Sequence, residues 1–165
     1  MAQQSSRTDE SIDEVLQKYA QMVYQIAFAR VKNKADAEDI MQDVFVRFIR
    51  CKTEFNDETH KRSWLIRAAI NCSKSLIGSF WRKQTVELNN EAVIHRDPDN
   101  SVLSAVLELP KKYRTVIILH YYQGVPTGEM AEILKMNEST VRSHLFRARK
   151  LLKELLKGDY SDDLE

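Results

Sequence analysis

The sequence has few of the residues that turn or cross-link a chain. Four glycines, three prolines and two cysteines occur among its 165 residues. A β-sandwich or β-barrel needs many turns, so the shortage of glycine and proline counts against an all-β fold. The two cysteines, Cys51 and Cys72, are far apart and form no CxxC pair. This spacing excludes a disulfide scaffold and favours a reducing compartment, so we expect a cytoplasmic protein.

Long apolar runs and motifs for chemistry are also missing. No apolar run reaches the ~18 residues of a transmembrane helix, so we expect no insertion into a membrane. Residues 1–10 are polar, lack the apolar core of a signal peptide and predict a disordered tail. The four histidines have no metal-ligand spacing. With no phosphate-binding loop or nucleophile elbow, the sequence predicts no cofactor, no metal, no small-molecule substrate and no enzymatic activity.

The residues that are abundant favour helices. Apolar residues make up 43% of the chain, enough for packed cores, and leucine, alanine, lysine, glutamate and arginine are good helix formers. Apolar positions recur with helical spacing, which predicts helices over residues 11–31, 35–51, 63–83, 101–109, 111–123, 128–134 and 138–157. We therefore predict an all-α protein.

These helices fall into two groups. Residues 11–83 predict a small domain of three to four helices, and residues 101–157 predict a four-helix domain that contains a helix-turn-helix. Residues 84–100 are turn-rich and poor in apolar side chains, which is typical of a flexible linker. We expect the last helix to end at Gly158 and residues 158–165 to form an acidic tail.

Positive charge is concentrated in two stretches, although the net formal charge is +1. Residues 59–86 and 139–153 contain no acidic residue. Two such patches predict two contacts with a polyanion, and solvated helix faces are the alternative. The basic residues of these patches are Lys61, Arg62, Arg67, Lys74, Arg82 and Lys83 in the first and Arg142, Arg147, Arg149, Lys150 and Lys153 in the second.

Residues 126–150 predict a helix-turn-helix, a helix of about eight residues followed by a short turn and a longer helix. One buried seam is predicted by the spacing of Val141, Leu145, Ala148, Leu152 and Leu155. The opposite face can enter a major groove, with its first residues at base edges and its later basic residues at phosphates. Lys135 occupies the turn position that is often glycine, which predicts strain. A hairpin used only for packing is the alternative.

The first domain carries a second nucleic-acid feature. Residues 52–62 lack periodicity and predict a loop. Phe55 and Asn56 in this loop, with Asn71 in the next helix, are suited to stacking on unpaired bases and bonding to them. Trp64 lies on the apolar stripe of that helix, and we expect it in the core.

An acidic helix face precedes this loop. It is formed by Asp39, Gln42 and Asp43. Because its charge should repel DNA, it is either solvated or docked on a basic protein surface.

Together these motifs resemble the extracytoplasmic function (ECF) type of the sigma-70 family of bacterial RNA polymerase sigma factors, over about residues 12–156. Residues 36–45 (DAEDIMQDVF) resemble the family's helix that binds core polymerase. Residues 63–71 (SWLIRAAIN) resemble its helix for the minus-ten promoter element. Residues 109–149, with LPKKYRTV, TVRS and RAR, resemble its domain for the minus-thirty-five element. The motifs occur in the family's order.

The resemblance implies a role for each motif. Contacts with the clamp coiled coil of the large polymerase subunit are implied for Asp39, Gln42, Asp43 and Phe45. The loop and the helix after it would capture a base extruded from the minus-ten element, through Phe55, Asn56, Lys61, Arg62, Arg67, Asn71 and Lys74. The minus-thirty-five element would be read by Glu138, Ser139, Thr140, Arg142, Ser143, Phe146, Arg147 and Arg149.

The implied partners are core RNA polymerase and promoter DNA. Members of the family are often held inactive by a membrane-bound anti-sigma factor, which we expect here as well. The main alternative is a stand-alone helix-turn-helix regulator; it needs its own dimer interface, and no coiled-coil heptads are evident. An enzyme that processes nucleic acid is the other alternative.

Overall fold

The computed structural model describes residues 11–83 and 101–162, with side chains over residues 11–75 and 101–158. Within these ranges the chain forms helices and connecting turns and contains no strand. The predicted all-α class is therefore confirmed.

The chain divides into two compact units, residues 1–86 and 87–165. The predicted tail over residues 1–10 and the predicted linker over residues 84–100 lie outside the described residues.

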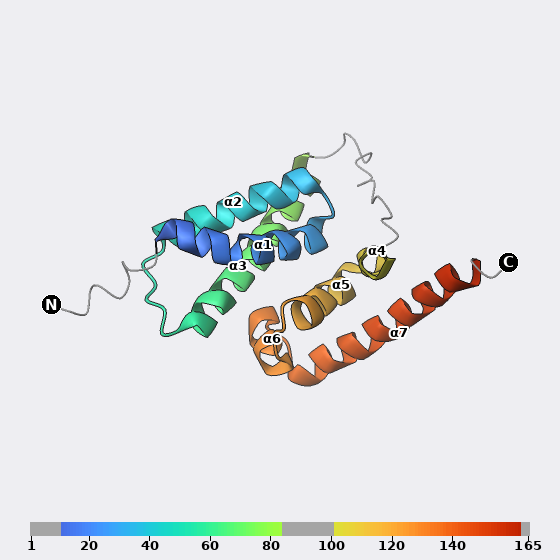
Figure 1. The fold of residues 1–165 in the computed structure, drawn as a ribbon. Helices are drawn as coiled ribbons and strands as arrows, with labels where there is room; N and C mark the ends of the chain where they lie inside the picture. The colour runs from blue at the N-terminus through green and yellow to red at the C-terminus, as the bar shows by residue number, and fades with distance from the viewer. Residues whose placement is uncertain (1–10, 84–100, 163–165) are drawn as a thin grey trace. The chain divides into compact units, whose positions relative to one another are not determined.

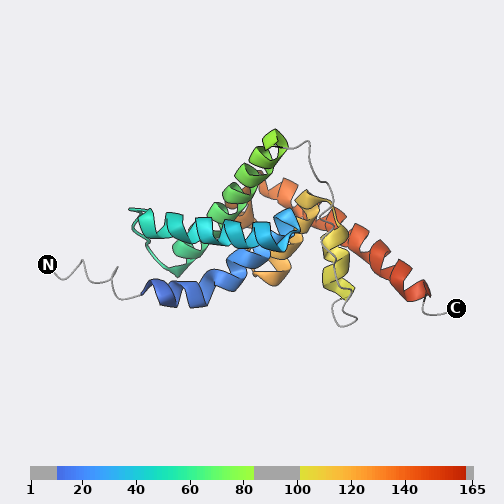
Figure 2. The ribbon, with the colours of Figure 1, turned by 90° about the horizontal axis from the view of Figure 1, so that it is seen from above.

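In its described part, the first unit consists of α1 (Ile12–Val31), α2 (Lys34–Arg50) and α3 (Glu58–Lys83), each packed against the other two (Figures 1 and 2). Ser11 and Asn33 cap α1 and α2, because their side-chain oxygens accept a backbone N–H of the first turn at 3.2 and 3.0 Å. The core of the unit contains the fully buried side chains of Val23, Ile26, Val44, Leu65, Ile66 and Ile70.

Helix α3 begins at Glu58, earlier than the predicted start at Ser63. The backbone N–H of His60 donates to Asp57 Oδ1 at 2.7 Å, so Asp57 acts as an N-cap. The polar residues after it belong to the first turns of the helix, where apolar periodicity gives no signal. The predicted loop over residues 52–62 is therefore shorter and covers residues 51–57.

The second unit contains a long C-terminal helix that packs against the shorter helices before it. This helix, α7, contacts α4, α5 and α6 and extends past them toward its C-terminal end (Figures 1 and 2). The elements are α4 (Ser101–Glu108), α5 (Lys111–Ile117), the π-helical segment η3 (Ile118–Tyr122), α6 (Thr127–Leu134) and α7 (Glu138–Asp162). The predicted seam of α7 is confirmed for Val141, Leu145 and Ala148, which are buried. Leu152 and Leu155, further along the helix, are only half-buried.

Two features of this unit differ from the prediction. Helix α7 continues through Gly158, because a glycine in an exposed helix costs only about 1 kcal/mol relative to alanine. The helix predicted over residues 111–123 changes its geometry at Ile118. The backbone N–H of Gln123 donates to the Ile118 carbonyl at 3.1 Å, the i→i+5 pattern of a π-helix.

A buried arginine holds the corner between α4 and α5. Arg114 is 6% exposed, and its Nη1 donates to the carbonyl of Leu109 at 2.9 Å and more weakly to that of Leu107 at 3.5 Å. These carbonyls lie at the end of α4, where helical hydrogen bonding stops. Arg114 thus replaces part of the hydrogen bonding that Pro110 interrupts.

The turn of the helix-turn-helix has a backbone geometry at Lys135 that is unfavourable for any residue with a Cβ atom. Lys135 has φ 54° and ψ 50°, in the left-handed region. The N–H of Met136 donates to the Ala131 carbonyl at 3.0 Å and that of Lys135 to the Glu132 carbonyl at 3.4 Å, which together form a Schellman motif. The predicted strain at Lys135 is confirmed.

We expect Lys135→Gly to stabilise the second unit by about 0.5–1 kcal/mol, because glycine adopts positive φ without a Cβ penalty. Thermal denaturation should show a rise of a few degrees in the melting temperature. Lys135→Ala is the matched control, since it removes the side chain but keeps the Cβ. Equal melting temperatures for the glycine and alanine variants would contradict this account.

Candidate nucleic-acid interface

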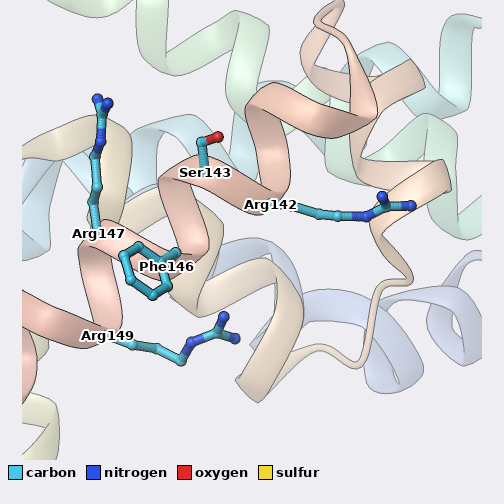
Figure 3. A pocket seen from close by; sticks show the side chains of 5 residues that line it. All are labelled: Arg142, Ser143, Phe146, Arg147 and Arg149. Carbon is cyan, nitrogen blue, oxygen red and sulfur yellow. The ribbon is translucent and has the colours of Figure 1, made fainter.

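The exposed face of α7 gathers most of the residues that the sequence assigned to the minus-thirty-five element. Because Val141, Leu145 and Ala148 are buried on one side, the opposite side points to solvent. A shallow surface depression on this side is lined by Arg142, Ser143, Phe146, Arg147 and Arg149. In Figure 3, Phe146 lies between Arg147 and Arg149, and it is 64% exposed. An exposed aromatic ring among cations is suited to a nucleic-acid surface.

Glu138 organises the beginning of this face. Its Oε1 accepts Arg142 Nη2 at 2.8 Å and Thr127 Oγ1 at 2.9 Å. These two donors, Thr127 first, lower the pKa of Glu138. Glu138 therefore joins the first residues of α6 and α7 and orients Arg142. The sequence did not point to Thr127, because nothing in its local pattern indicates a contact between the two helix starts.

Arg149 contacts a residue that the sequence analysis missed. Its Nη1 donates to the hydroxyl of Tyr121 at 2.9 Å. Tyr121 belongs to the π-helical segment η3 and is 54% exposed. No spacing rule connects two residues so far apart in the chain.

The loop over residues 51–57 rests on an aromatic cluster. Phe55 stacks on Phe48 with ring centroids 5.7 Å apart and meets Trp64 and His60 edge-on at 6.0 and 5.3 Å. Phe55 is half-buried, whereas Asn56 is exposed. The backbone N–H of Asn56 donates to His60 Nδ1 at 3.1 Å. The structure thus leaves Asn56 the more accessible of the two predicted base contacts.

The carboxylate of Glu58, at the end of the loop, forms hydrogen bonds with α1. Glu58 accepts hydrogen bonds from Tyr19 Oη and from Lys18 Nζ at 2.9 Å, and forms an ion pair with Lys61 at 3.2 Å. These contacts, chiefly the bond from Tyr19 and then that from Lys18, lower the pKa of Glu58 to about 2. The cation of Lys61 is thereby partly neutralised.

Further along α3, three predicted minus-ten residues share one exposed face. Arg67, Asn71 and Lys74 are all exposed, and their spacing of four and three residues places them on one side of the helix. Arg62, the remaining predicted residue, is half-buried. The first unit therefore has an accessible loop and, further along α3, an exposed polar helix face.

The acidic face of α2 is exposed, with one correction. Asp39, Gln42 and Asp43 are exposed, and Asp43 forms an ion pair with Arg47 at 3.3 Å. Burial, together with a hydrogen bond to Asp43, raises the pKa of the Cys72 thiol to about 11. Phe45 is 5% exposed, so its side chain lies in the core and not on this face.

Two apolar residues extend the α2 face beyond its acids. Val46 is 42% exposed and Ile49 is 54% exposed. Their spacing from Asp39 and Gln42 follows the helical repeat, so all four share one side of α2. Neither residue was predicted to be exposed, because an apolar residue in an amphipathic helix is ordinarily buried.

Features of other site classes are missing from the described ranges. No three histidine, cysteine, aspartate or glutamate side chains are grouped to hold a metal ion there. In the same ranges, no helix has both the length and the apolar character needed to cross a membrane.

Both units match family models. Residues 15–85 match sigma-70 region 2, and residues 99–152 match sigma-70 region 4. The RNA polymerase sigma factor SigV of Bacillus subtilis is 35% identical over 87% of this chain and 90% of its own length. The ECF RNA polymerase sigma factor SigX of the same organism is 28% identical over 88% of this chain and 84% of its own length.

A solved structure has a similar fold. The sigma factor RpoE of Bartonella quintana, crystallised with the anti-sigma factor NepR, aligns with a TM-score of 0.70 at 20% identity, over 88% of this chain and 96% of that one.

Two helical units in this order, the second with an exposed arginine-rich face, define a DNA-binding factor of transcription initiation. The chain belongs to the sigma-70 family of RNA polymerase sigma factors, in its ECF subfamily. It directs RNA polymerase to promoters, as the resemblance of the sequence implied, and a stand-alone regulator is not favoured.

Proposed function

We propose that the two units of this sigma factor bind the promoter and the polymerase through separate faces. In this proposal the exposed face of α7 binds the minus-thirty-five element, the loop over residues 51–57 with α3 binds the minus-ten element, and α2 binds core polymerase. The observation that carries the proposal is the basic face of α7 after Glu138, on which Arg142, Arg147 and Arg149 surround an exposed phenylalanine. We also propose that the protein acts in the cytoplasm, by binding and without catalysis.

The minus-ten assignment is supported by how the loop is held. Extruding a base from duplex DNA costs a few kcal/mol, which a capture site must recover through stacking and hydrogen bonds. The loop over residues 51–57 is fixed by its aromatic cluster and by Glu58, so little ordering is needed when a base enters. In this proposal the exposed Asn56 supplies hydrogen bonds to the base, and Arg67 and Lys74 neutralise the DNA backbone.

The polymerase assignment is supported by the composition of the α2 face. Asp39, Gln42 and Asp43 supply charge and polarity, and Val46 and Ile49 supply exposed apolar surface. Protein interfaces combine an apolar centre with a polar rim. A basic partner helix with apolar positions, such as a polymerase coiled coil, complements this face.

We further propose that an anti-sigma factor inhibits this chain. The relative RpoE was crystallised with its anti-sigma factor NepR. An inhibitor that competes with polymerase should cover the α2 face. Charge reversal at Asp39 would then weaken the binding of both polymerase and the anti-sigma factor, which a pull-down from native cells would test.

Run-off transcription with purified core polymerase tests the proposal as a whole. We expect the chain to confer initiation at specific promoters and to lose it when either promoter element is replaced. A stand-alone regulator would bind DNA but not core polymerase. Hydrolysis or modification of DNA or RNA by the isolated protein, lost on metal chelation, would instead support the enzyme alternative.

We expect Arg142→Ala to weaken discrimination at one base pair of the minus-thirty-five element by about 1–3 kcal/mol, as for loss of a bidentate base contact. Binding titrations on duplexes substituted at each position would measure this. Lys153→Ala is the matched control, because it removes an exposed cation from the same helix. A loss of equal size on every duplex would reassign Arg142 to a phosphate.

A further inference from the structure

We propose that Tyr121 and Arg149 form a clamp for one DNA phosphate, which extends the minus-thirty-five interface from α7 onto the π-helical segment η3. The inference rests on the proposed function of the α7 face and adds a residue outside the helix-turn-helix. Its basis is the hydrogen bond between two exposed side chains, from Arg149 Nη1 to Tyr121 Oη at 2.9 Å.

The backbone holds Tyr121 in place. A π-helical turn is rare and occurs often at functional sites. Here it ends at Tyr122. Gly124, shortly after it, has φ +65°, and the N–H of Val125 donates to the Leu119 carbonyl at 2.9 Å. These bonds fix the segment that carries Tyr121 although its side chain is exposed.

A neighbouring histidine supports the tyrosine ring. His120 Nδ1 lies 3.1 Å from the carbonyl of Val125, and its ring meets that of Tyr121 edge-on with centroids 4.9 Å apart. Because a carbonyl only accepts, Nδ1 carries the proton in this contact. The hydroxyl of Tyr121 is thus positioned by both backbone and ring contacts.

The chemistry of the pair suits an anion. The tyrosine oxygen accepts from Arg149, so its own proton remains available to donate. The guanidinium has further N–H groups, and a phosphate oxygen can receive both donors with the strength of charge-assisted bonds. Residues 139–153 contain no carboxylate that would compete from the same stretch of α7.

The position of the pair favours a phosphate over a base. Arg149 lies about two helical turns after Arg142, in the later part of α7. In helix-turn-helix proteins the first residues of the second helix reach base edges, and contacts to phosphates fix the register of the protein on the duplex. A neutral hydroxyl beside an arginine strengthens binding to the DNA backbone without adding a sequence preference.

Tyr121→Phe tests the clamp, because it removes the hydroxyl and keeps the ring. We expect the full chain, alone and in holoenzyme, to bind minus-thirty-five duplexes about three to ten times more weakly, with its order of base preference unchanged. Tyr122→Phe is the matched control, since Tyr122 is the adjacent tyrosine and is 43% exposed. The melting temperature should not change in either variant.

Salt dependence and coupling separate the clamp from a structural role. Arg149→Ala should lower the slope of log affinity against log salt by about one, whereas Tyr121→Phe should not, because its hydroxyl is uncharged. In the Arg149→Ala background, Tyr121→Phe should change affinity less than about twofold, since the two donors act together.

Three results would overturn the clamp. They are wild-type affinity for Tyr121→Phe, additive effects of the two substitutions, or a changed base preference. Weaker binding of Tyr121→Phe to core polymerase, with unchanged DNA binding, would show a protein-docking surface instead. Failure of the underlying DNA assignment is distinguishable, because Arg142→Ala would then also leave DNA affinity unchanged.

Discussion

Asp39→Arg should reduce the affinity of the chain for core RNA polymerase by at least about 30-fold. Asp39 is exposed on the α2 face that continues into Val46 and Ile49. Removing one partner of a charge pair that an interface buries costs about 2–5 kcal/mol, largely because the other charge is left unpaired. Fluorescence titration of purified core polymerase with labelled chain would measure the loss.

Asp39 is a cleaner target than Asp43. Asp43 already pairs with Arg47 and accepts from the Cys72 thiol, so replacing it disturbs contacts within the unit. Asp13→Arg is the control, because it makes the same charge change at an exposed position of α1. Polymerase affinity equal to that of the control would refute the role of the α2 face, whereas binding to minus-thirty-five duplexes should not change in either variant.

Arg114→Met should destabilise the second unit by about 2–3 kcal/mol. Methionine fills a similar volume but donates no hydrogen bond, so the carbonyls of Leu107 and Leu109 lose a charged donor. In a unit of this size the melting temperature should fall by roughly 10–20 °C. Because α5 packs against α7, minus-thirty-five binding should fail at the same temperature.

Amide hydrogen exchange resolved along the chain would measure this effect, since it separates the second unit from the first. Lys112→Met is the control, because Lys112 is an exposed cation on the same helix. The ammonium of Lys112 lies 5.0 Å from the Tyr113 ring centroid. Unchanged protection of α4 and α5 in Arg114→Met would show that the corner is held by packing alone.

Features that repeat along the chain were predictable from sequence. The spacing of Val141, Leu145 and Ala148 predicted the buried side of α7 and, with it, the exposed face that carries Arg142 and Phe146. The predicted start of α3 was wrong because capping by Asp57 depends on one polar side chain, which leaves no trace in the apolar periodicity.

Contacts between distant residues were not predictable in this way. Glu58 of α3 accepts a hydrogen bond from Lys18 of α1. Arg149 donates one to Tyr121, which lies in a π-helical turn that no local pattern indicates. Phe45 was assigned to the polymerase contact through the family motif, but the motif does not state which of its residues face solvent. Its burial and the exposure of Ile49 follow from how α2 is rotated against α1 and α3.

The shared carboxylate of Glu138 has a consequence for selectivity. In the free protein Arg142 already has a partner at 2.8 Å, so a contact with DNA has to replace this ion pair. A base edge with two well-placed acceptors can win this exchange, whereas one with a single acceptor leaves Arg142 nearly as well bonded where it was. Selectivity depends on the difference between such alternatives. In the proposed minus-thirty-five interface, Glu138 is thus an internal competitor for Arg142, of small effect, because an exposed i,i+4 ion pair contributes little.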